Sequence, residues 1–324
     1  MSSKLFLSIL GCAALATPGI FADEYRLSGP YTHDNLSIFL IHGANKPAGK
    51  YLTLQEAMDQ KKVVVYETGS VNQLAVENLS DEEVYIQSGD IVKGGKQDRV
   101  FPDDFILQTK SGKVPIASFC VEHGRWTGRG TEPTGQFHAS TQSLPMKSLK
   151  MAARDEHNQQ QVWDQVAQAE RKFASSLGMA AALPSPSPTS MQLALENPKV
   201  AEATDAYLRD LSKIVNGKPD VVGYAFAING TVNSADMYAS NEMFRRMWPK
   251  LLRASAVEAL TERNAASAST PPDTAKVRLF LRDAGVGKES SKGPVVRKDS
   301  EKAVLFETRA PSSSNWIHRS YVAK

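Results

Sequence analysis

The chain has 324 residues, of which 41% are hydrophobic and 23% are charged, and its formal net charge is +3. This composition is that of an ordinary globular protein with enough apolar material for a large core. The charge balance argues against a nucleic-acid-binding protein, because such a protein normally carries a larger or more clustered basic excess.

The first 22 residues (1–22) follow the pattern of a secretory signal peptide. Lys4 precedes an apolar run that ends at Ala16, and a small residue follows at Ala22. The run is too short for a membrane-spanning helix. We therefore expect cleavage after Ala16 or Ala22 and export to the periplasm or the extracellular space. The alternative is a lipid anchor, because "ILGC" resembles a lipobox that would be acylated at Cys12.

The mature chain, residues 23–324, is expected to lack a transmembrane span, because no downstream stretch approaches the roughly 18 apolar residues that a spanning helix needs. Once Cys12 is removed, Cys120 is the only cysteine. An internal disulfide and a Cys-x-x-Cys pair are therefore excluded. The histidines show no recognisable ligand spacing, so we expect no metal and no cofactor. The oligomeric state stays open.

Between residues 35 and 126 the sequence predicts mostly short strands. Aliphatic or β-branched runs end at turn residues, and the predicted strands fall at 36–43, 62–67, 71–78, 84–92 and 103–122. One short helix is expected at 52–60. This density of short strands indicates an antiparallel β-sandwich or a barrel-like sheet.

Helices are predicted after these strands. An apolar stripe at helical spacing predicts a helix over 150–177. A second helix is expected from Asn197 to Gly217, and a third covers 240–262. The Pro- and Ser-rich stretch at about 180–192 indicates a surface loop.

A β-hairpin is predicted where Asn229-Gly230 joins 220–228 to 231–238, because Asn-Gly is the preferred two-residue turn. Three closing strands are expected to complete the early sheet, at 276–283, 302–308 and 315–322. Surface loops are expected at 265–275 and 284–300. We predict an α+β fold, with an antiparallel β-sandwich or barrel-like sheet and packed helices, in a single large domain.

A dense run of reactive residue types lies in "SFCVEHGRWTGRG" at 118–130. Side chains alternate along a strand, so Cys120 and Glu122 are expected on one face while His123 points away from Cys120. This geometry argues against a Cys–His dyad of near neighbours, and we expect Cys120 to be a packed structural residue. Histidines from elsewhere in the chain stay open as partners: His42, His138 and His318.

Glu122 has two interpretations. A buried carboxylate needs a partner, and Arg125 lies just past a turn at Gly124. In the structural interpretation these two side chains form an ion pair, and Trp126 fills the corner of the sheet. In the functional interpretation the carboxylate, the guanidinium and the aromatic ring face a polar planar or phosphorylated molecule.

The stretch 88–100, "SGDIVKGGKQDRV", is rich in glycine and cations. It is not a phosphate-binding P-loop, because the glycine spacing fails and no Ser or Thr follows the lysine. Gly94 and Gly95 predict a turn or bulge where backbone N–H groups are exposed. Three donor side chains then follow at Lys96, Gln97 and Arg99. The alternative is a polar loop between two strands.

The two runs together resemble the ADP-ribosylglycohydrolase (ARG) and rhodanese-phosphatase superfamily-associated protein domain, a little-characterised bacterial family. Its members pair a Lys-Gln-x-Arg run, here 96–99, with a Cys-Val-Glu-x-Gly-Arg-Trp run, here 120–126. "QQVWDQV" at 160–166 and the predicted hairpin are also similar, so the resemblance covers about 35–324. The resemblance implies a nucleotide- or ADP-ribose-like ligand by analogy, and no reaction.

Three functions follow as hypotheses. The first is an exported binding domain for an anionic, nucleotide- or ADP-ribose-like molecule, held by Lys96, Gln97, Arg99, Arg125 and Trp126. In it the supporting residues are structural: Gly94, Gly95, Cys120 and Gly124. The second is a hydrolase acting on a phosphate- or ribose-containing substrate, with Glu122 as general acid or base. The third is a structural or partner-binding envelope protein in which both motifs are scaffold.

Overall fold

The computed structural model describes residues 25–46, 49–128, 134–178, 187–263, 270–311, 313 and 315–324. The predicted signal peptide, its cleavage sites and Cys12 lie outside the described residues.

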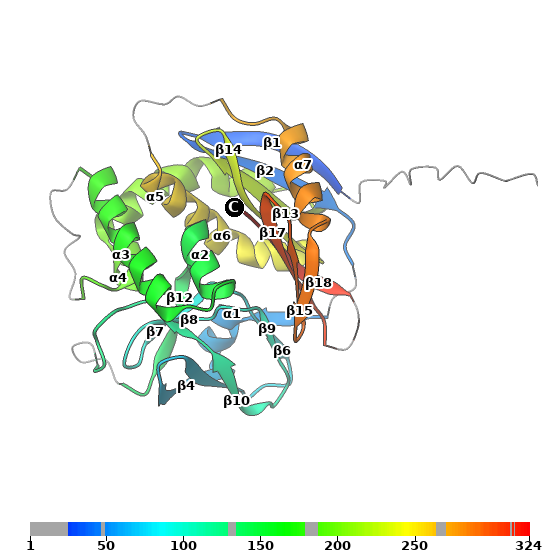
Figure 1. Cartoon of the computed structure of the whole chain (residues 1–324). Coiled ribbons are helices and arrows are strands. Elements are labelled where there is room, and N and C mark those ends of the chain that lie inside the picture. Colours follow the sequence, from blue (N-terminus) through cyan, green and yellow to red (C-terminus); the bar gives the residue numbers. More distant parts are fainter. Residues whose placement is uncertain are drawn as a thin grey trace, which may run out of the picture.

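One large antiparallel sheet organises the fold (Figure 1), with strand order β1-β2-β13-β14-β18-β17-β16-β15. Strands from both ends of the chain meet in it, because β2 pairs with β13. The strands are β1 Tyr25–His33, β2 Leu36–Gly43, β13 Val221–Ile228, β14 Thr231–Tyr238, β15 Lys288–Lys292, β16 Val295–Asp299, β17 Ala303–Arg309 and β18 Trp316–Ala323. The α+β prediction and the joining of early and late strands are confirmed. Among the described strands this sheet is open and does not close into a barrel.

Helices cover both faces of the large sheet, because alternate side chains of its central strands are apolar on both faces. Leu36, Ile38 and Leu40 of β2 are buried in one core cluster together with residues of α5 and α6. Phe39 and Ile41 point to the other face and are buried with residues of α7. Because successive side chains face opposite sides, a strand buried on both faces is apolar throughout. The three helices are α5 Pro198–Leu211, α6 Asn241–Thr261 and α7 Thr274–Gly285.

Three smaller sheets form the lower part of the view in Figure 1. Their orders are β11-β8-β7-β12, β3-β6-β9 and β10-β5-β4. Their strands are β3 Tyr51–Thr53, β4 Val63–Ser70, β5 Gln73–Asn78, β6 Glu83–Ile86, β7 Asp90–Gly94, β8 Arg99–Val100, β9 Phe105–Leu107, β10 Gly112–Ala117, β11 Phe119–Cys120 and β12 Phe137–Ser143. The remaining helices are α1 Leu54–Asp59, α2 Lys147–Arg154, α3 Gln159–Ser176, α4 Met191–Glu196 and the 3₁₀ helix Ser212–Val215. The predicted short helix at 52–60 is therefore confirmed as α1.

The strand predicted at 276–283 is wrong, because this segment is α7. Its buried residues Val277, Leu281 and Ala284 recur at helical spacing. Asp273 caps the first turn by accepting a hydrogen bond from the Lys276 backbone N–H at 2.8 Å. The apolar residues of "KVRLFLRD" are compatible with a strand or a helix. The Asp273 cap and the helical spacing of the buried residues favour the helix.

The loop boundaries also differ from the prediction. The predicted loop 284–300 contains the hairpin β15–β16, which pairs Lys292 with Val295. The loop predicted at 180–192 runs into α4, while 179–186 lie outside the described residues. The loop predicted at 265–275 is likewise described only from residue 270, and α7 begins within it.

The single helix predicted over 150–177 is two helices, α2 and α3. Between them His157 has a positive φ of 47°. Asn158 caps α3 by accepting a hydrogen bond from the Gln161 backbone N–H at 3.1 Å. The hairpin at Asn229-Gly230 and the Asn197 cap of α5 are both confirmed. None of the described helices is long and apolar enough to cross a membrane.

Candidate functional site: a buried motif network and the Arg154 pocket

The Lys-Gln-x-Arg motif lies in the connection between β7 and β8. Gly94 and Gly95 both have positive φ, at 120° and 56°. A Cβ on Gly95 would lie 2.2 Å from Cζ of Phe137. Only glycine is compatible with this close approach, and the predicted turn at Gly94-Gly95 is present.

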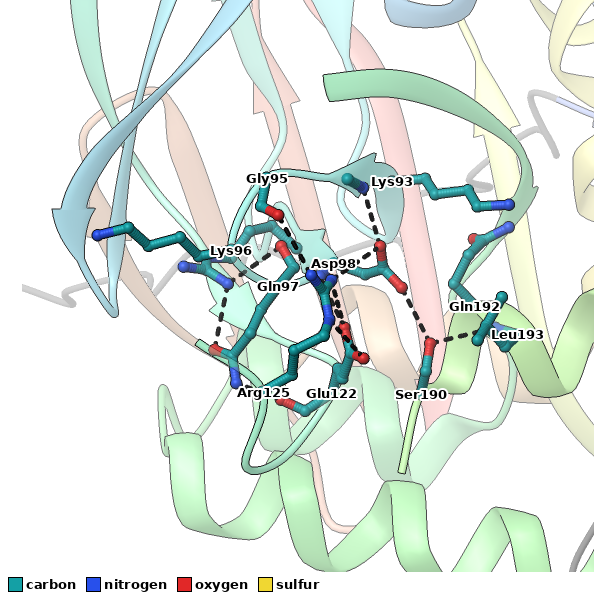
Figure 2. A network of polar contacts seen from close by, with 12 residues as sticks. Lys93, Gly95, Lys96, Gln97, Asp98, Glu122, Arg125, Ser190, Gln192 and Leu193 are labelled. Carbon is teal, nitrogen blue, oxygen red and sulfur yellow. Dashed lines mark hydrogen bonds and ion pairs between the residues drawn. The ribbon is translucent and has the colours of Figure 1, made fainter. Parts of the chain in front are cut away.

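The second motif meets this turn through a buried ion pair (Figure 2). Nε of Arg125 donates to Oε1 of Glu122 at 2.7 Å, and Nη2 lies 2.7 Å from Oε2. Glu122 is fully buried, and the Arg125 side chain is 10% exposed. Burial would raise the pKa of Glu122, but hydrogen bonds from Arg125 and Ser187 hold it below its ordinary value. The pair is bidentate, which is the strongest arrangement of this type.

Gln97 and Arg125 join the two motifs directly. Nε2 of Gln97 donates to the backbone carbonyl of Glu122 at 2.9 Å, and Nη1 of Arg125 donates to the carbonyl of Gly95 at 3.2 Å. Nη1 of Arg125 also donates to the carbonyl of Thr127 at 2.5 Å. The Arg125 guanidinium is therefore held by the Glu122 carboxylate and by two backbone carbonyls of the protein itself.

Asp98 belongs to the same network, although the sequence analysis did not select it. One carboxylate oxygen accepts from the Gly94 backbone N–H at 2.9 Å, and the other accepts from Oγ of Ser190 at 2.9 Å. Ser190 also caps α4, because its Oγ accepts from the Leu193 backbone N–H. Figure 2 shows this chain of contacts running from the glycine turn to the start of α4.

Arg99 is fully buried, whereas the neighbouring side chains of Lys96 and Trp126 are partly exposed. It is 0% exposed, and Nη1 donates to the backbone carbonyl of Gln97 at 3.2 Å. Its Nη2 lies 3.7 Å from a carboxylate oxygen of Glu67. The ring of Trp126 is 38% exposed and is approached by the Arg99 guanidinium at 5.4 Å and by Nζ of Lys96 at 5.0 Å. Among the predicted ligand-binding residues, Lys96 and Trp126 are thus the more accessible ones.

Cys120 is fully buried, and burial raises the pKa of its thiol to about 11. The Gln159 side chain makes two hydrogen bonds to the backbone of Cys120. It accepts from the Cys120 N–H at 2.8 Å and donates to the Cys120 carbonyl at 2.9 Å. His123 is exposed, and its ring packs against Trp163 with the centroids 4.6 Å apart. The predicted two-faced strand is wrong in detail, because it breaks at Ser118 and residues 118–122 are all buried.

A second concentration of charge is buried beside the large sheet. Nδ1 of His318, on β18, lies 2.6 Å from Oδ2 of Asp104, and Nε2 lies 3.2 Å from Oδ1 of Asp236 on β14. Burial alone would lower the pKa of His318, but the two carboxylates outweigh it and raise the pKa to about 9. His318 is therefore an imidazolium at neutral pH, held between two carboxylates.

Asp104 has little capacity left for a further donor. Its Oδ1 accepts from the Ser88 backbone N–H at 2.8 Å, and Oδ2 accepts from Oγ1 of Thr308 at 2.6 Å as well as from His318. Burial would raise the pKa of Asp104, but Arg154, His318 and the Thr308 hydrogen bond lower it well below the ordinary range. This carboxylate stays ionised.

Arg154, the last residue of α2, is the unusual member of this cluster. Its side chain is 4% exposed, and Nη2 lies 3.4 Å from Oδ2 of Asp104. Its Nε and Nη2 make no hydrogen bond to any described residue. The guanidinium stacks over the ring of Phe306, 4.4 Å from the ring centroid. Buried donors are nearly always paired in native proteins, so this one requires an explanation.

A pocket of about 400 Å³ opens beside Arg154, and we call it the Arg154 pocket. Its walls include Asp103, Phe105, Arg154, His157, Arg297 and Phe306. A smaller cavity, whose lining includes Lys150, Asp236 and His318, shares Arg154 and Phe306 with the pocket. The pocket has the size of a small-molecule site. Within the described residues, no group of three or more His, Cys, Asp or Glu is placed to hold a metal ion.

The fold and these two features define an α+β protein with an internally paired motif network and, apart from it, a largely apolar pocket with a buried arginine on its wall. Residues 24–322 match the family model described as the ARG and Rhodanese-Phosphatase-superfamily-associated Protein domain, and the chain belongs to this family. No curated protein and no solved structure matches the chain.

Proposed function

We propose that the protein is an exported binding domain for a small anionic molecule, which it holds in the Arg154 pocket. The observation that carries this proposal is a buried guanidinium on the wall of a pocket of about 400 Å³. Its Nε and Nη2 make no hydrogen bond to any described residue, although Nη2 lies 3.4 Å from the Asp104 carboxylate. A bound carboxylate or phosphate would complete the hydrogen bonding that the chain leaves unmade.

The charges of the cluster support an anion rather than a neutral ligand. Asp104 and Asp236 are the carboxylates, and His318 lies between them. Two further cations, Arg154 and Lys150, act on the same carboxylates. This buried cluster therefore contains three cations and two carboxylates, and an anion held at Arg154 would balance it, whereas Asp103 and Asp155 add negative charge elsewhere on the pocket wall. A buried charge without compensation is strongly unfavourable.

The two sequence motifs take a different role in this proposal. Glu122 and Arg125 are bound to each other, and Gln97 and Asp98 tie the same loops together. We propose that they form a structural clamp. A general acid or base must exchange protons near the working pH, whereas Glu122 is fully buried and its pKa is lowered. This geometry disfavours the hydrolase hypothesis based on Glu122.

Export is part of the proposal and rests on the first 22 residues. They combine one lysine, an apolar run and a small residue in the order that a signal peptide requires. The family match begins at residue 24, just after the expected cleavage site at Ala22.

Ligand stabilisation tests the proposed function. A ligand that binds only the folded state raises the melting temperature. We expect inorganic phosphate or benzoate to raise the melting temperature of the mature chain and to lose this effect in Arg154→Gln. The matched control is Arg253→Gln, because Arg253 is half-buried outside the pocket lining and forms an ion pair with the exposed Asp205 at 3.5 Å. Equal stabilisation of all three proteins, or of none, would refute the proposal.

A further inference from the structure

We infer that the Arg154 pocket accepts a ligand with one anionic head on a flat apolar body, and that it discriminates against ligands with two or more anionic groups. This inference rests on the proposed function and narrows it to a class of ligand. It follows from the distribution of charge between the inner end of the pocket and its mouth.

The buried end of the pocket carries Arg154, whose side chain is 4% exposed, and the Asp104 carboxylate lies 3.4 Å from its Nη2. Phe306 stacks on the guanidinium at 4.4 Å. Phe105 is half-buried on the wall, and Pro294 and Val295 add apolar surface. A flat apolar body would bury its faces against these side chains while its anionic head meets the guanidinium.

The mouth is lined by more carboxylates than cations. The mouth here is the more exposed part of the lining, with Asp103, Asp155 and one arginine, Arg297, whose side chains are 33%, 17% and 29% exposed. Nη2 of Arg297 donates to Asp155 at 3.0 Å, Nε donates to the same carboxylate, and Nη1 donates to Asp299 at 2.9 Å. Arg297 is therefore not available for a second anionic group unless these contacts break.

A second phosphate at the mouth would meet the carboxylates without a free guanidinium. Like charges within a few ångströms repel, and the repulsion is stronger where the walls exclude water. A diphosphate such as ADP-ribose is therefore disfavoured, although its size would fit a pocket of this class. The carboxylates at the mouth therefore disfavour ligands with a second anionic group, while Arg154 favours ligands with one.

Isothermal titration of the full mature chain with four probes tests this inference: phenyl phosphate, benzoate, inorganic phosphate and ADP-ribose. Phenyl phosphate or benzoate is expected to bind at least tenfold more tightly than inorganic phosphate, because only the former bury an apolar ring. Which of the two aromatic probes binds more tightly distinguishes a phosphate head from a carboxylate head. ADP-ribose is expected to bind at least tenfold more weakly than the better aromatic probe.

The variant Asp103→Asn isolates the charge at the mouth. It should strengthen ADP-ribose binding several-fold and strengthen binding of the aromatic probes by a smaller factor, because they place no second anionic group near Asp103. If ADP-ribose binds as tightly as the aromatic probes, or inorganic phosphate does, the inference is wrong while the proposed function stands. If no probe binds, or if Arg154→Gln binds every probe as the parent protein does, the proposed function itself fails and the inference fails with it.

Discussion

Arg125 holds both carboxylate oxygens of Glu122, with Nε–Oε1 and Nη2–Oε2 distances of 2.7 Å each. The contact lies where the Lys-Gln-x-Arg turn, the Cys-Val-Glu run and the start of α4 meet. The most recognisable residues of the sequence are thus bonded mainly to one another, and this changes which substitutions are expected to affect stability and which to affect binding.

Arg125→Ala should destabilise the fold strongly. The substitution leaves the fully buried carboxylate of Glu122 without its main partner, and breaking a buried pair from one side typically costs about 3–5 kcal/mol. Urea denaturation of the variant and the parent protein measures the loss. Lys96→Ala is the control, because Lys96 belongs to the neighbouring Lys-Gln-x-Arg motif but is only half-buried. The unfolding free energy of this variant should differ from that of the parent protein by less than about 1 kcal/mol.

The double variant Glu122→Gln/Arg125→Ala separates a stranded charge from lost packing. Removal of the carboxylate's charge should recover part of the stability that Arg125→Ala loses. A double variant that is less stable than Arg125→Ala would contradict the ion-pair explanation.

Cys120 should be unreactive in the folded protein. Burial raises the pKa of its thiol to about 11, and the thiolate is the reactive form. We expect no labelling by a maleimide at pH 7.5 before unfolding and complete labelling in denaturant. Cys120→Ala should retain all ligand binding. Rapid labelling of the native chain would show that Cys120 is an accessible nucleophile.

Much of the fold follows from local sequence signals. The Asn229-Gly230 turn, the Asn197 cap and the Thr53–Glu56 capping box are each made by neighbouring residues, and the structure contains all three. The strand predicted at 276–283 is wrong because a short apolar run fits both a strand and a helix. The signal that distinguishes the two is the Asp273 cap before the run.

The candidate site could not be predicted from local sequence patterns, because its residues are far apart in the chain. Asp104, Arg154 and His318 come from a loop, a helix end and a late strand, and nothing in their spacing relates them. An Asp or His inside an apolar strand, such as Asp236 and His318, does indicate a buried charge that must be paired. Which groups form the pairs is decided only by the strand order of the large sheet.

Stability should fall in alkaline solution because of His318. Its pKa is about 9 in the folded protein and near 6.5 when unfolded, so the folded state binds its proton more tightly. The resulting stabilisation, on the order of 3 kcal/mol, is complete below about pH 6.5, declines above it and is lost by about pH 9. Urea titrations at pH 6 and pH 9 should show a larger loss for the parent protein than for His318→Gln.

The difference between the two proteins is the informative quantity, because other titrating groups are common to both. Glu170, whose pKa burial raises to about 7, is one of them. An identical dependence on pH in the parent protein and His318→Gln would mean that His318 does not carry the linked proton.

We expect the chain to be exported and to lose its first residues on export. The signal pattern of residues 1–22 predicts an amino terminus at Asp23, or at Thr17 if the earlier site is used. Intact-mass measurement of the protein from the envelope and the medium of the producing cell checks this. A full-length chain recovered only from the cytoplasm would exclude export.

The most direct test of the central claim observes the Arg154 guanidinium itself. Its Nε–H is buried, so it should give a resolved resonance in a ¹⁵N–¹H spectrum, assigned by its disappearance in Arg154→Gln. Titration with phenyl phosphate should shift this resonance and saturate, because a hydrogen bond forms at Arg154. If Arg154 stays unchanged while the resonances of Arg99 or Arg125 shift, the ligand binds at the sequence motifs, and the assignment of the pocket is wrong.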